Sequence, residues 1–132
     1  MTNSSVELVR EYFAAVANGD LAKLPTLFSE TLVWHQPGES DLSGTHTGQQ
    51  AVFGLIGTFM ERSRGTFRFD SIGTILGNGD YVAVTVQFSA NAPGKSIAMA
   101  GIDVLRIENG SIQEVWLFSE DQAAEDSFWN AD

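Results

Sequence analysis

The stretch GIDVLRIENGSIQEVWLF, residues 101–118, has the pattern of two strands joined by a tight turn. Asn109-Gly110 is a pair that two-residue type I′ turns favour, because both central positions need a positive φ. A turn of this kind sets Glu108 opposite Ser111 and fixes the pairing of the residues on either side. The stretch therefore predicts an antiparallel hairpin with a defined register.

Counting back from the turn predicts which side chains share a face of this hairpin. The expected pairs are Ile107 with Ile112, Leu105 with Glu114, and Asp103 with Trp116. On this register Asp103 and Glu114 interrupt one apolar face at diagonal positions, about 7–8 Å apart. Both carboxyl groups would then point to the same side of the sheet.

The two acids differ in what surrounds them in the sequence. For Glu114 a solvent-facing side of the sheet is an equally open interpretation. Asp103 is flanked by Ile102, Val104 and Leu105, which indicates burial on both faces. A buried carboxyl group must find hydrogen-bond partners or keep its proton, and such groups concentrate in functional clefts. Asp103 is therefore a candidate site residue.

Helices are predicted before the strands. Ser4 and Glu7 form a capping box at the start of a helix that ends at Asn18-Gly19. A short second helix is expected from Asp20 to about Phe28, and a third from Gly48 to about Met60. The expected strands cover residues 32–36, 67–75, 82–88, 97–107 and 112–118, with a polar loop after Pro37-Gly38. Helices followed by antiparallel strands predict one α+β domain, residues 1–132, with helices on one face of a sheet.

Composition narrows the possible partners. Seventeen acidic against seven basic residues give a formal net charge of −10, which argues against nucleic-acid binding because that relies on clustered Lys and Arg. The chain has no cysteine, which excludes thiolate nucleophiles and thiolate zinc sites. No apolar run approaches membrane-spanning length, so we expect a cytoplasmic protein with no membrane partner. The acids near the C-terminus, among them Glu125, are interpreted as solubilising charge.

Two segments resemble a known family. EYFAAVANGDLAKLPTLFSETLVWHQP (residues 11–37) is similar to the opening of bacterial ketosteroid isomerases, and GIDVLR is similar to the strand that carries their protonated aspartic acid. The whole chain, including the ending VWLFSEDQAAEDSFW, resembles the SnoaL-like branch of the nuclear transport factor 2-like superfamily. The resemblance implies a cone-shaped, curved, mostly antiparallel sheet on N-terminal helices, an enclosed apolar pocket, and a homodimer formed through the sheet.

The resemblance also implies roles for three positions. Tyr12 falls on the family's oxyanion-hole tyrosine, and Asp103 falls on the partner acid that stays neutral to donate a hydrogen bond to an enolate. The general-base aspartate of the isomerases falls on Gln36, whose amide cannot accept a proton from carbon. Conventional steroid isomerisation through that base is therefore not expected.

Another residue would have to act as the base. Glu114 is the preferred substitute on the predicted register, which gives the catalytic set Tyr12, Asp103 and Glu114. His35 would point away from the pocket by strand alternation and is interpreted as structural or exposed. His46 can either reach the pocket mouth or face water.

The remaining candidates are pocket-lining residues, although aromatic residues at helix and strand periods are also typical of a core. They are Trp34, Gln36, His46, Phe53, Phe59, Trp116 and Phe118. No ligand-spaced cluster indicates a metal, and no motif indicates a nucleotide or flavin cofactor. We expect neither.

These observations favour a cofactor-independent enzyme, isomerase-like or polyketide cyclase-like, acting on a small apolar carbonyl compound. A non-catalytic binding or accessory domain of the same fold is the alternative, motivated by Gln36. Epoxide hydrolysis ranks third, because the Asp–Arg–Asp arrangement of that branch is not evident.

Overall fold

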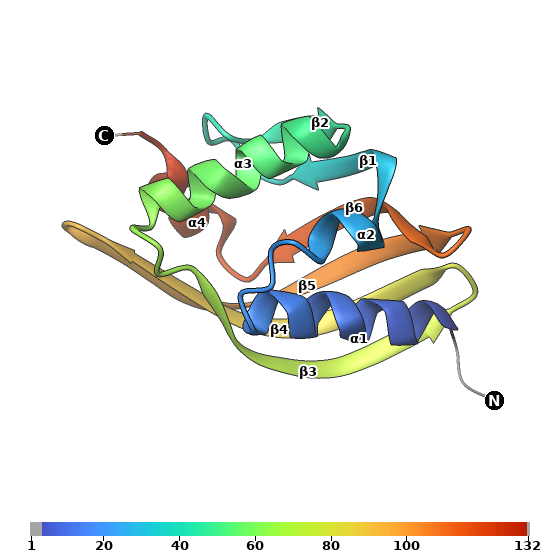
Figure 1. Ribbon diagram of the computed structural model, residues 1–132. Coiled ribbons are helices and arrows are strands. Elements are labelled where there is room, and N and C mark those ends of the chain that lie inside the picture. The colour runs from blue at the N-terminus through green and yellow to red at the C-terminus, as the bar shows by residue number, and fades with distance from the viewer. Residues whose placement is uncertain (1–3, 132) are drawn as a thin grey trace.

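The strands of this chain form one curved, six-stranded sheet in a computed structural model that describes residues 4–131 (Figure 1). The helices are α1 (Ser4–Ala17), α2 (Leu24–Leu27), α3 (Gln49–Arg62) and α4 (Gln122–Trp129). The strands are β1 (Phe28–Gln36), β2 (Gly44–Thr47), β3 (Arg68–Asn78), β4 (Tyr81–Ala92), β5 (Lys95–Glu108) and β6 (Ser111–Ser119). The predicted α+β architecture is confirmed.

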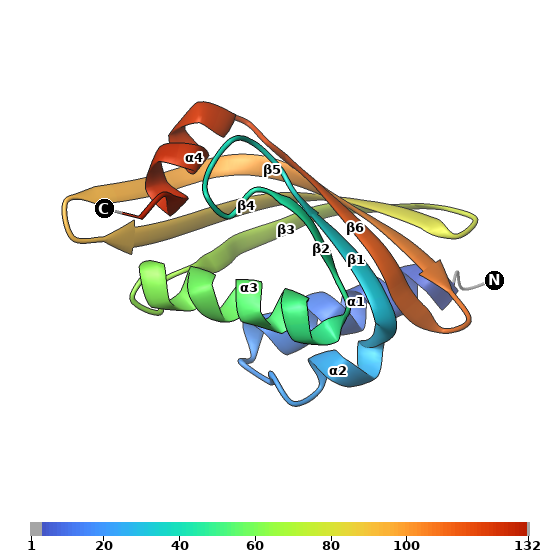
Figure 2. The ribbon, with the colours of Figure 1, turned by 90° about the horizontal axis from the view of Figure 1, so that it is seen from above.

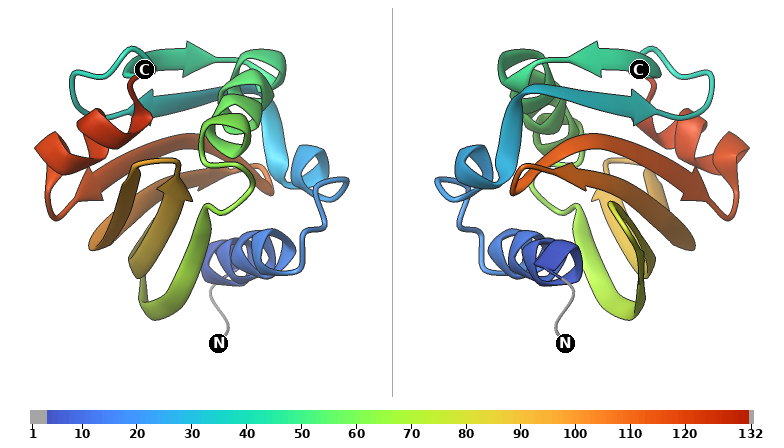
Figure 3. Two further views of the ribbon diagram at one scale, coloured as in Figure 1. Left: turned by 90° about the vertical axis from the view of Figure 1, so that its left-hand side faces the viewer. Right: turned by 90° about the vertical axis from the view of Figure 1, so that its right-hand side faces the viewer.

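The sheet has the order β2-β1-β6-β5-β4-β3. All neighbouring pairs are antiparallel except β1 with β6, which run parallel. Figure 2 shows β1 lying beside β6, so the first strand of the chain pairs with the last. Figure 3 shows the sheet curving around the side on which α1 and α3 lie. We call this concave side the inner face and the opposite side the outer face.

The inner face carries the hydrophobic core. Alternate residues of β4 point inward and are fully or almost fully buried, which is the period-two pattern of a half-covered strand. Helices α1 and α3 supply the opposing surface, and residues such as Val9 and Val52 are completely buried. Burying a side chain of this kind contributes about 1.5–3 kcal/mol. This packing determines which strand residues face the interior.

The hairpin of β5 and β6 departs from the predicted register. Glu108 pairs with Ser111 and Ile107 with Ile112, as predicted, but the register then shifts by one residue at Gln113. Beyond this β-bulge, Leu105 pairs with Val115, Arg106 with Glu114, and Asp103 with Leu117. One extra residue in a strand sends every later side chain to the opposite face. The predicted pairs of Leu105 with Glu114 and of Asp103 with Trp116 are therefore wrong.

Helix α4 was not predicted, and it closes one end of the molecule. Asp121 caps it by accepting a hydrogen bond from the Ala124 backbone N–H at 3.0 Å. The loop after β1 lies against it, and the Glu39 N–H donates to Asp126 Oδ2 at 2.8 Å. Gly38 permits this contact, because a Cβ atom there would lie 2.0 Å from Asp126 Oδ1 and the residue has φ +88°.

Two further differences concern the N-terminal half. The predicted polar loop contains the short strand β2, which pairs with β1. The predicted second helix is reduced to one turn, Leu24–Leu27, with Pro25 in its first positions.

Candidate functional site

Asp103 lies on the inner face, in the middle of β5. Its cross-strand neighbours are Val84 on β4 and Leu117 on β6, and the side chain is only 6 % exposed. Burial raises the pKa of the Asp103 carboxyl to about 7, with a smaller contribution from the negative charge of Glu125. The group therefore holds its proton over much of the range in which an ordinary aspartate is ionised.

Tyr12 projects from α1 into the same interior. It is 4 % exposed, and its ring lies 5.0 Å from Phe13 and 5.6 Å from Phe28, centroid to centroid. Burial raises its pKa above the usual value, and the charge of Asp103 adds to the effect. The phenol therefore stays a hydrogen-bond donor at any physiological pH.

The polar atoms of these two residues are not used by the rest of the fold. Within residues 4–131 no protein group forms a hydrogen bond with the Asp103 carboxyl or the Tyr12 hydroxyl, yet no completely buried polar side-chain atom lacks a partner. The oxygens of Tyr12 and Asp103 must therefore keep a small contact with solvent-accessible space. Two unsatisfied donors directed into an apolar interior are an arrangement suited to an oxygen of a ligand.

Gln36 lies at the end of β1, also on the inner side, and is buried. Its Oε1 accepts a hydrogen bond from the Trp34 indole N–H at 3.1 Å. Because its carbonyl oxygen is engaged and its amide cannot take a proton, Gln36 is not suited to act as a base.

Glu125 on α4 is a buried acid that sequence reasoning assigned to a solubilising tail. That interpretation is wrong for this residue, which is 6 % exposed and accepts hydrogen bonds from Ser119, Gln122 and Trp129. The available signal was the capping residue Asp121, followed by Ala124 and Phe128 at helical spacing, which would have predicted α4 and placed one of its faces inward.

Glu114 lies on the outer face, because the bulge at Gln113 reverses its direction relative to the prediction. Its Oε2 is 2.5 Å from His35 Nε2, and its Oε1 is 3.5 Å from Arg106 Nη2. The ring of His35 stacks on Trp116 at 5.5 Å. Glu114 and Trp116 are thus part of a half-exposed network on the opposite side of the sheet from Asp103. His35 points away from the inner face, as predicted, whereas Glu114 and Trp116 do not point inward as predicted.

The other predicted pocket-lining residues form two groups, because Trp34 pairs with His46 and bonds to Gln36, whereas Phe53 and Phe59 belong to α3. His46 Nε2 donates to the Leu42 carbonyl at 3.0 Å, on the same side of the sheet as Trp34. Phe53 lies 5.8 Å from Phe28, and Phe59 lies 4.5 Å from Trp129, centroid to centroid, so both contribute to the packed interior. Trp34 is buried beside Gln36.

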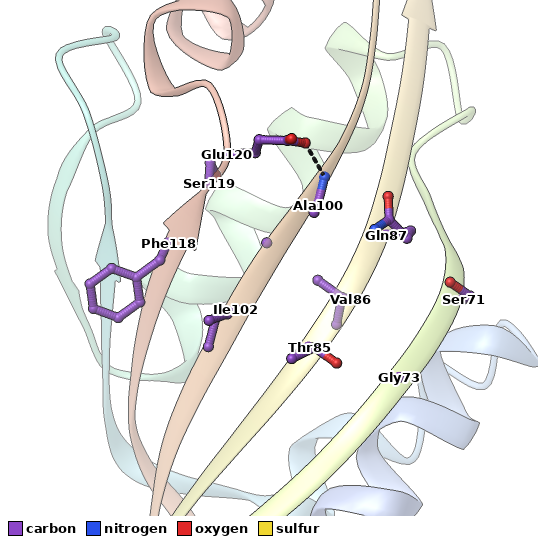
Figure 4. Close-up of a pocket in the computed structure, with 11 residues that line it drawn as sticks. Ser71, Gly73, Thr85, Val86, Gln87, Ala100, Ile102, Phe118, Ser119 and Glu120 are labelled. Carbon is purple, nitrogen blue, oxygen red and sulfur yellow. Dashed lines mark hydrogen bonds between the residues drawn. The ribbon is translucent and has the colours of Figure 1, made fainter.

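A groove of about 520 Å³ lies on the outer face, where Figure 4 shows Ile102 and Phe118 beside Thr85, Gln87 and Glu120. Phe118 lines this groove and is 58 % exposed, so it does not face the interior with Asp103. Gly101 sits at its floor, where a Cβ atom would meet the Phe118 carbonyl oxygen at 2.8 Å. This groove is thus on the side opposite to the predicted pocket.

Residues 4–131 contain no group of three or more His, Cys, Asp or Glu side chains placed to hold a metal ion. No helix within the same residues is long and apolar enough to cross a membrane.

Comparisons with known proteins place the chain in a family. It is 42% identical to a Xanthomonas campestris protein of unknown function with a cystatin-like fold, whose crystal structure matches with a TM-score of 0.93 over 96% of this chain and 98% of that one. An uncharacterized protein of Mycobacterium bovis is 30% identical over 128 residues, 96% of this chain and 97% of the relative. An NTF2-like protein of Burkholderia xenovorans shares the fold at 20% identity, with a TM-score of 0.77 over 98% of each chain.

The model of the SnoaL-like domain matches residues 9–115, which include Tyr12, Gln36 and Asp103. This match shows that the chain belongs to the SnoaL-like family.

Proposed function

We propose that this protein binds a small, mostly apolar molecule through a carbonyl or phenolic oxygen, and that Tyr12 and protonated Asp103 donate hydrogen bonds to that oxygen. The observation that carries the proposal is the buried Asp103 carboxyl, with a pKa of about 7 and no protein partner within residues 4–131. In an apolar interior, two such donors favour a ligand oxygen that carries partial or full negative charge.

The same contacts would support an isomerase-like or cyclase-like reaction. Loss of a proton from the carbon next to a carbonyl moves negative charge onto the oxygen, and donors already in place stabilise that enolate more than the neutral ketone. Glu114 is not part of this proposal, because it points to the other face. Asp103 itself can exchange a proton near neutrality, since its pKa is about 7.

Binding without catalysis is the second candidate function. It is favoured by Gln36, whose amide stands where the family resemblance implies a carboxylate base and whose oxygen accepts from Trp34. In that case the two donors would recognise a ligand without changing it.

Titration with an equilenin-like phenol tests the binding proposal. Tyr12→Phe and Asp103→Leu each remove one donor and should weaken binding about tenfold, the value of one hydrogen bond of roughly 1–1.5 kcal/mol. Asp103→Asn keeps a neutral donor, so this variant should retain most of the affinity. Its affinity should also not fall above neutral pH, where the Asp103 carboxyl would lose its proton. Glu114→Gln, the matched change on the outer face, should bind as the unmodified protein does. Equal binding by all four variants would contradict the proposal.

Proton exchange separates the two candidates. An enzyme that forms an enolate would exchange the α-protons of a bound ketone with deuterated solvent, and Asp103→Leu would slow the exchange. Binding that depends on Tyr12 and Asp103 without accelerated exchange would favour the non-catalytic function.

The outer face is the proposed contact between two copies of the chain. Tyr81, Ile102 and Phe118 are exposed there by 49 %, 42 % and 58 %, respectively, and the groove lies beside Phe118. A two-fold interface sets a surface against itself, so Phe118 of one copy can enter the groove of the other. Phe118→Asp should then lower the mass in sedimentation to that of one chain. Leu21→Asp, a similarly exposed residue between α1 and α2, should not change it.

A further inference from the structure

We infer that the Gln36 side-chain amide is a second recognition point of the proposed site, and that its Nε2 donates a hydrogen bond to a further oxygen of the ligand. The ligand then carries two acceptor oxygens on opposite sides of an apolar body, as a hydroxyketone or a diketone does. This role rests on the proposed function, because Tyr12 and Asp103 hold the first oxygen, and it narrows the class of molecule that the site takes.

Trp34 fixes the direction of the Gln36 amide. The Trp34 indole N–H donates to Gln36 Oε1 at 3.1 Å, and both side chains are buried. An indole nitrogen can only donate, so the amide oxygen must face Trp34 and the amide nitrogen must point elsewhere. Both N–H bonds of Nε2 are therefore left for another acceptor.

The part of the chain that the structure describes supplies no acceptor for this nitrogen. Gln36 is 5 % exposed, and within residues 4–131 its side chain bonds only to Trp34. No completely buried polar side-chain atom lacks a partner there, so Nε2 keeps a small contact with accessible space. The residue opposite Gln36 on β2 is Gly44, which has no side chain to cover the amide. A nearly buried donor without an acceptor is costly unless water or a ligand oxygen satisfies it.

Gln36 and Asp103 lie on the inner face, on either side of Leu117. Asp103 of β5 pairs with Leu117 of β6. The parallel register pairs His35 with Trp116, so the next residue of β1 lies level with Leu117. Neighbouring strands are about 4.8 Å apart, which places the backbones of Gln36 and Asp103 roughly 9–10 Å from each other. The sheet is concave on this side, so the two side chains lean toward a common space (Figure 3).

The surface between these two polar groups is apolar and incompletely covered. Leu117 points inward but is only partly buried, whereas Val84, on the other side of Asp103, is completely buried. The covering helices therefore leave part of Leu117 open to a ligand. An aromatic ring lying on Leu117 can present one oxygen to Tyr12 and Asp103 and a second oxygen to Gln36, which is the pattern of an apolar site with a few polar groups.

Two phenols that differ in one carbonyl group test this role. Para-hydroxyacetophenone carries a phenolic oxygen and a ketone oxygen across one ring, and para-ethylphenol has the same carbon skeleton without the ketone. Affinities are measured by calorimetry below the Asp103 pKa of about 7. Gln36→Met removes the amide donor at similar length, so it should weaken the ketone about fivefold and leave para-ethylphenol nearly unchanged. Gln50→Met, the same change at an exposed position of α3, should weaken neither.

Trp34 acts in this arrangement as a positioning residue. Trp34→Phe removes the indole donor, so the amide can turn its oxygen toward the ligand. This variant should weaken the ketone more than para-ethylphenol. Equal weakening of the two ligands would contradict the positioning role of Trp34.

Equal changes for both ligands in Gln36→Met overturn the inference, because the amide would then read no second oxygen. If Gln36→Met does not fold, the unmodified protein decides. The resonances of the Gln36 side-chain amide, followed by nitrogen NMR, should move when para-hydroxyacetophenone binds and stay nearly in place when para-ethylphenol does. Amide resonances that respond alike to both ligands overturn the inference as well.

Failure of this role can be told apart from failure of the proposed function. Para-ethylphenol has no ketone, so its response to Tyr12→Phe and Asp103→Leu tests the first oxygen alone. If those changes weaken it while Gln36→Met treats both ligands alike, the site stands and the second contact is lost. If they have no effect on either ligand, the proposed function itself is contradicted.

Discussion

Asp103 and Glu114 belong to neighbouring strands of one hairpin, yet they lie on opposite faces of the sheet. Asp103 is enclosed by apolar side chains on the inner face, with burial raising its pKa to about 7. Glu114 is half-buried on the outer face and is paired with His35 and Arg106. The side of the sheet, more than the residue type, thus decides whether a carboxyl group keeps its proton to higher pH or becomes one member of an ion pair.

The bulge at Gln113 creates this difference, and a change in the length of the strand there should have the largest effect. Inserting one alanine after Gln113 would shift the later residues by one position, which would send Glu114 and Trp116 inward and Val115 and Leu117 outward. Because a buried unpaired charge and lost core packing each cost about 2–5 kcal/mol, the insertion should unfold the protein or nearly do so. Chemical denaturation measures the loss. Gln113→Ala keeps the length of the strand, and a comparable loss in that variant would contradict this account.

The pH dependence of stability should show the buried acid directly. The pKa of Asp103 is raised from 3.8 to about 7, so between those values the folded state holds one more proton than the unfolded state. The free energy of unfolding should therefore fall by roughly 1.4 kcal/mol per pH unit, from this group alone, as the pH rises through that window. The contribution is fully present below the window and lost above it.

Asp103→Asn should remove this slope, as measured by urea denaturation at a series of pH values. The same carboxyl-to-amide change at Glu114 should leave the slope in place. A slope that persists in Asp103→Asn would mean that another group titrates in this range.

The outer-face ion pair should contribute least. Glu114→Gln removes the charge partner of His35 and Arg106, whose side chains are 32 % and 27 % exposed. Solvent-accessible pairs of this kind contribute about 0–1 kcal/mol, so the free energy of unfolding at neutral pH should fall by no more than about 1 kcal/mol. A loss of several kcal/mol would indicate that the outer face is shielded from solvent, as the proposed contact between two copies requires.

Much of the fold could be predicted from local patterns. The helix predicted from Ser4 onward, the Asn109-Gly110 turn and the alternation along β4 each depend on patterns of a few residues, and each is confirmed. Burial of Asp103 was likewise predicted from its apolar neighbours. These features are determined by residues that are close together in the sequence.

The bulge and the hydrogen bonds that hold Glu125 could not be predicted in the same way. Gln113 is an ordinary strand residue without the glycine that marks some bulges, and its extra length is accommodated by the contacts of β6 with β1 and β5. In the sequence Glu125 resembles the other acids near it, because Ser119 and Trp129 donate hydrogen bonds to it only in the folded protein. Both errors concern tertiary contacts that override local pattern.

The parallel pairing of β1 with β6 has a consequence for how the chain assembles. β1 ends at Gln36 and β6 begins at Ser111, so the intervening helix α3 and four strands must be synthesised before the two can meet. Contacts between distant segments slow folding, because the loop between them loses entropy before the contact forms. During translation β1 can pair early only with the short strand β2, and the sheet closes when the last strand leaves the ribosome.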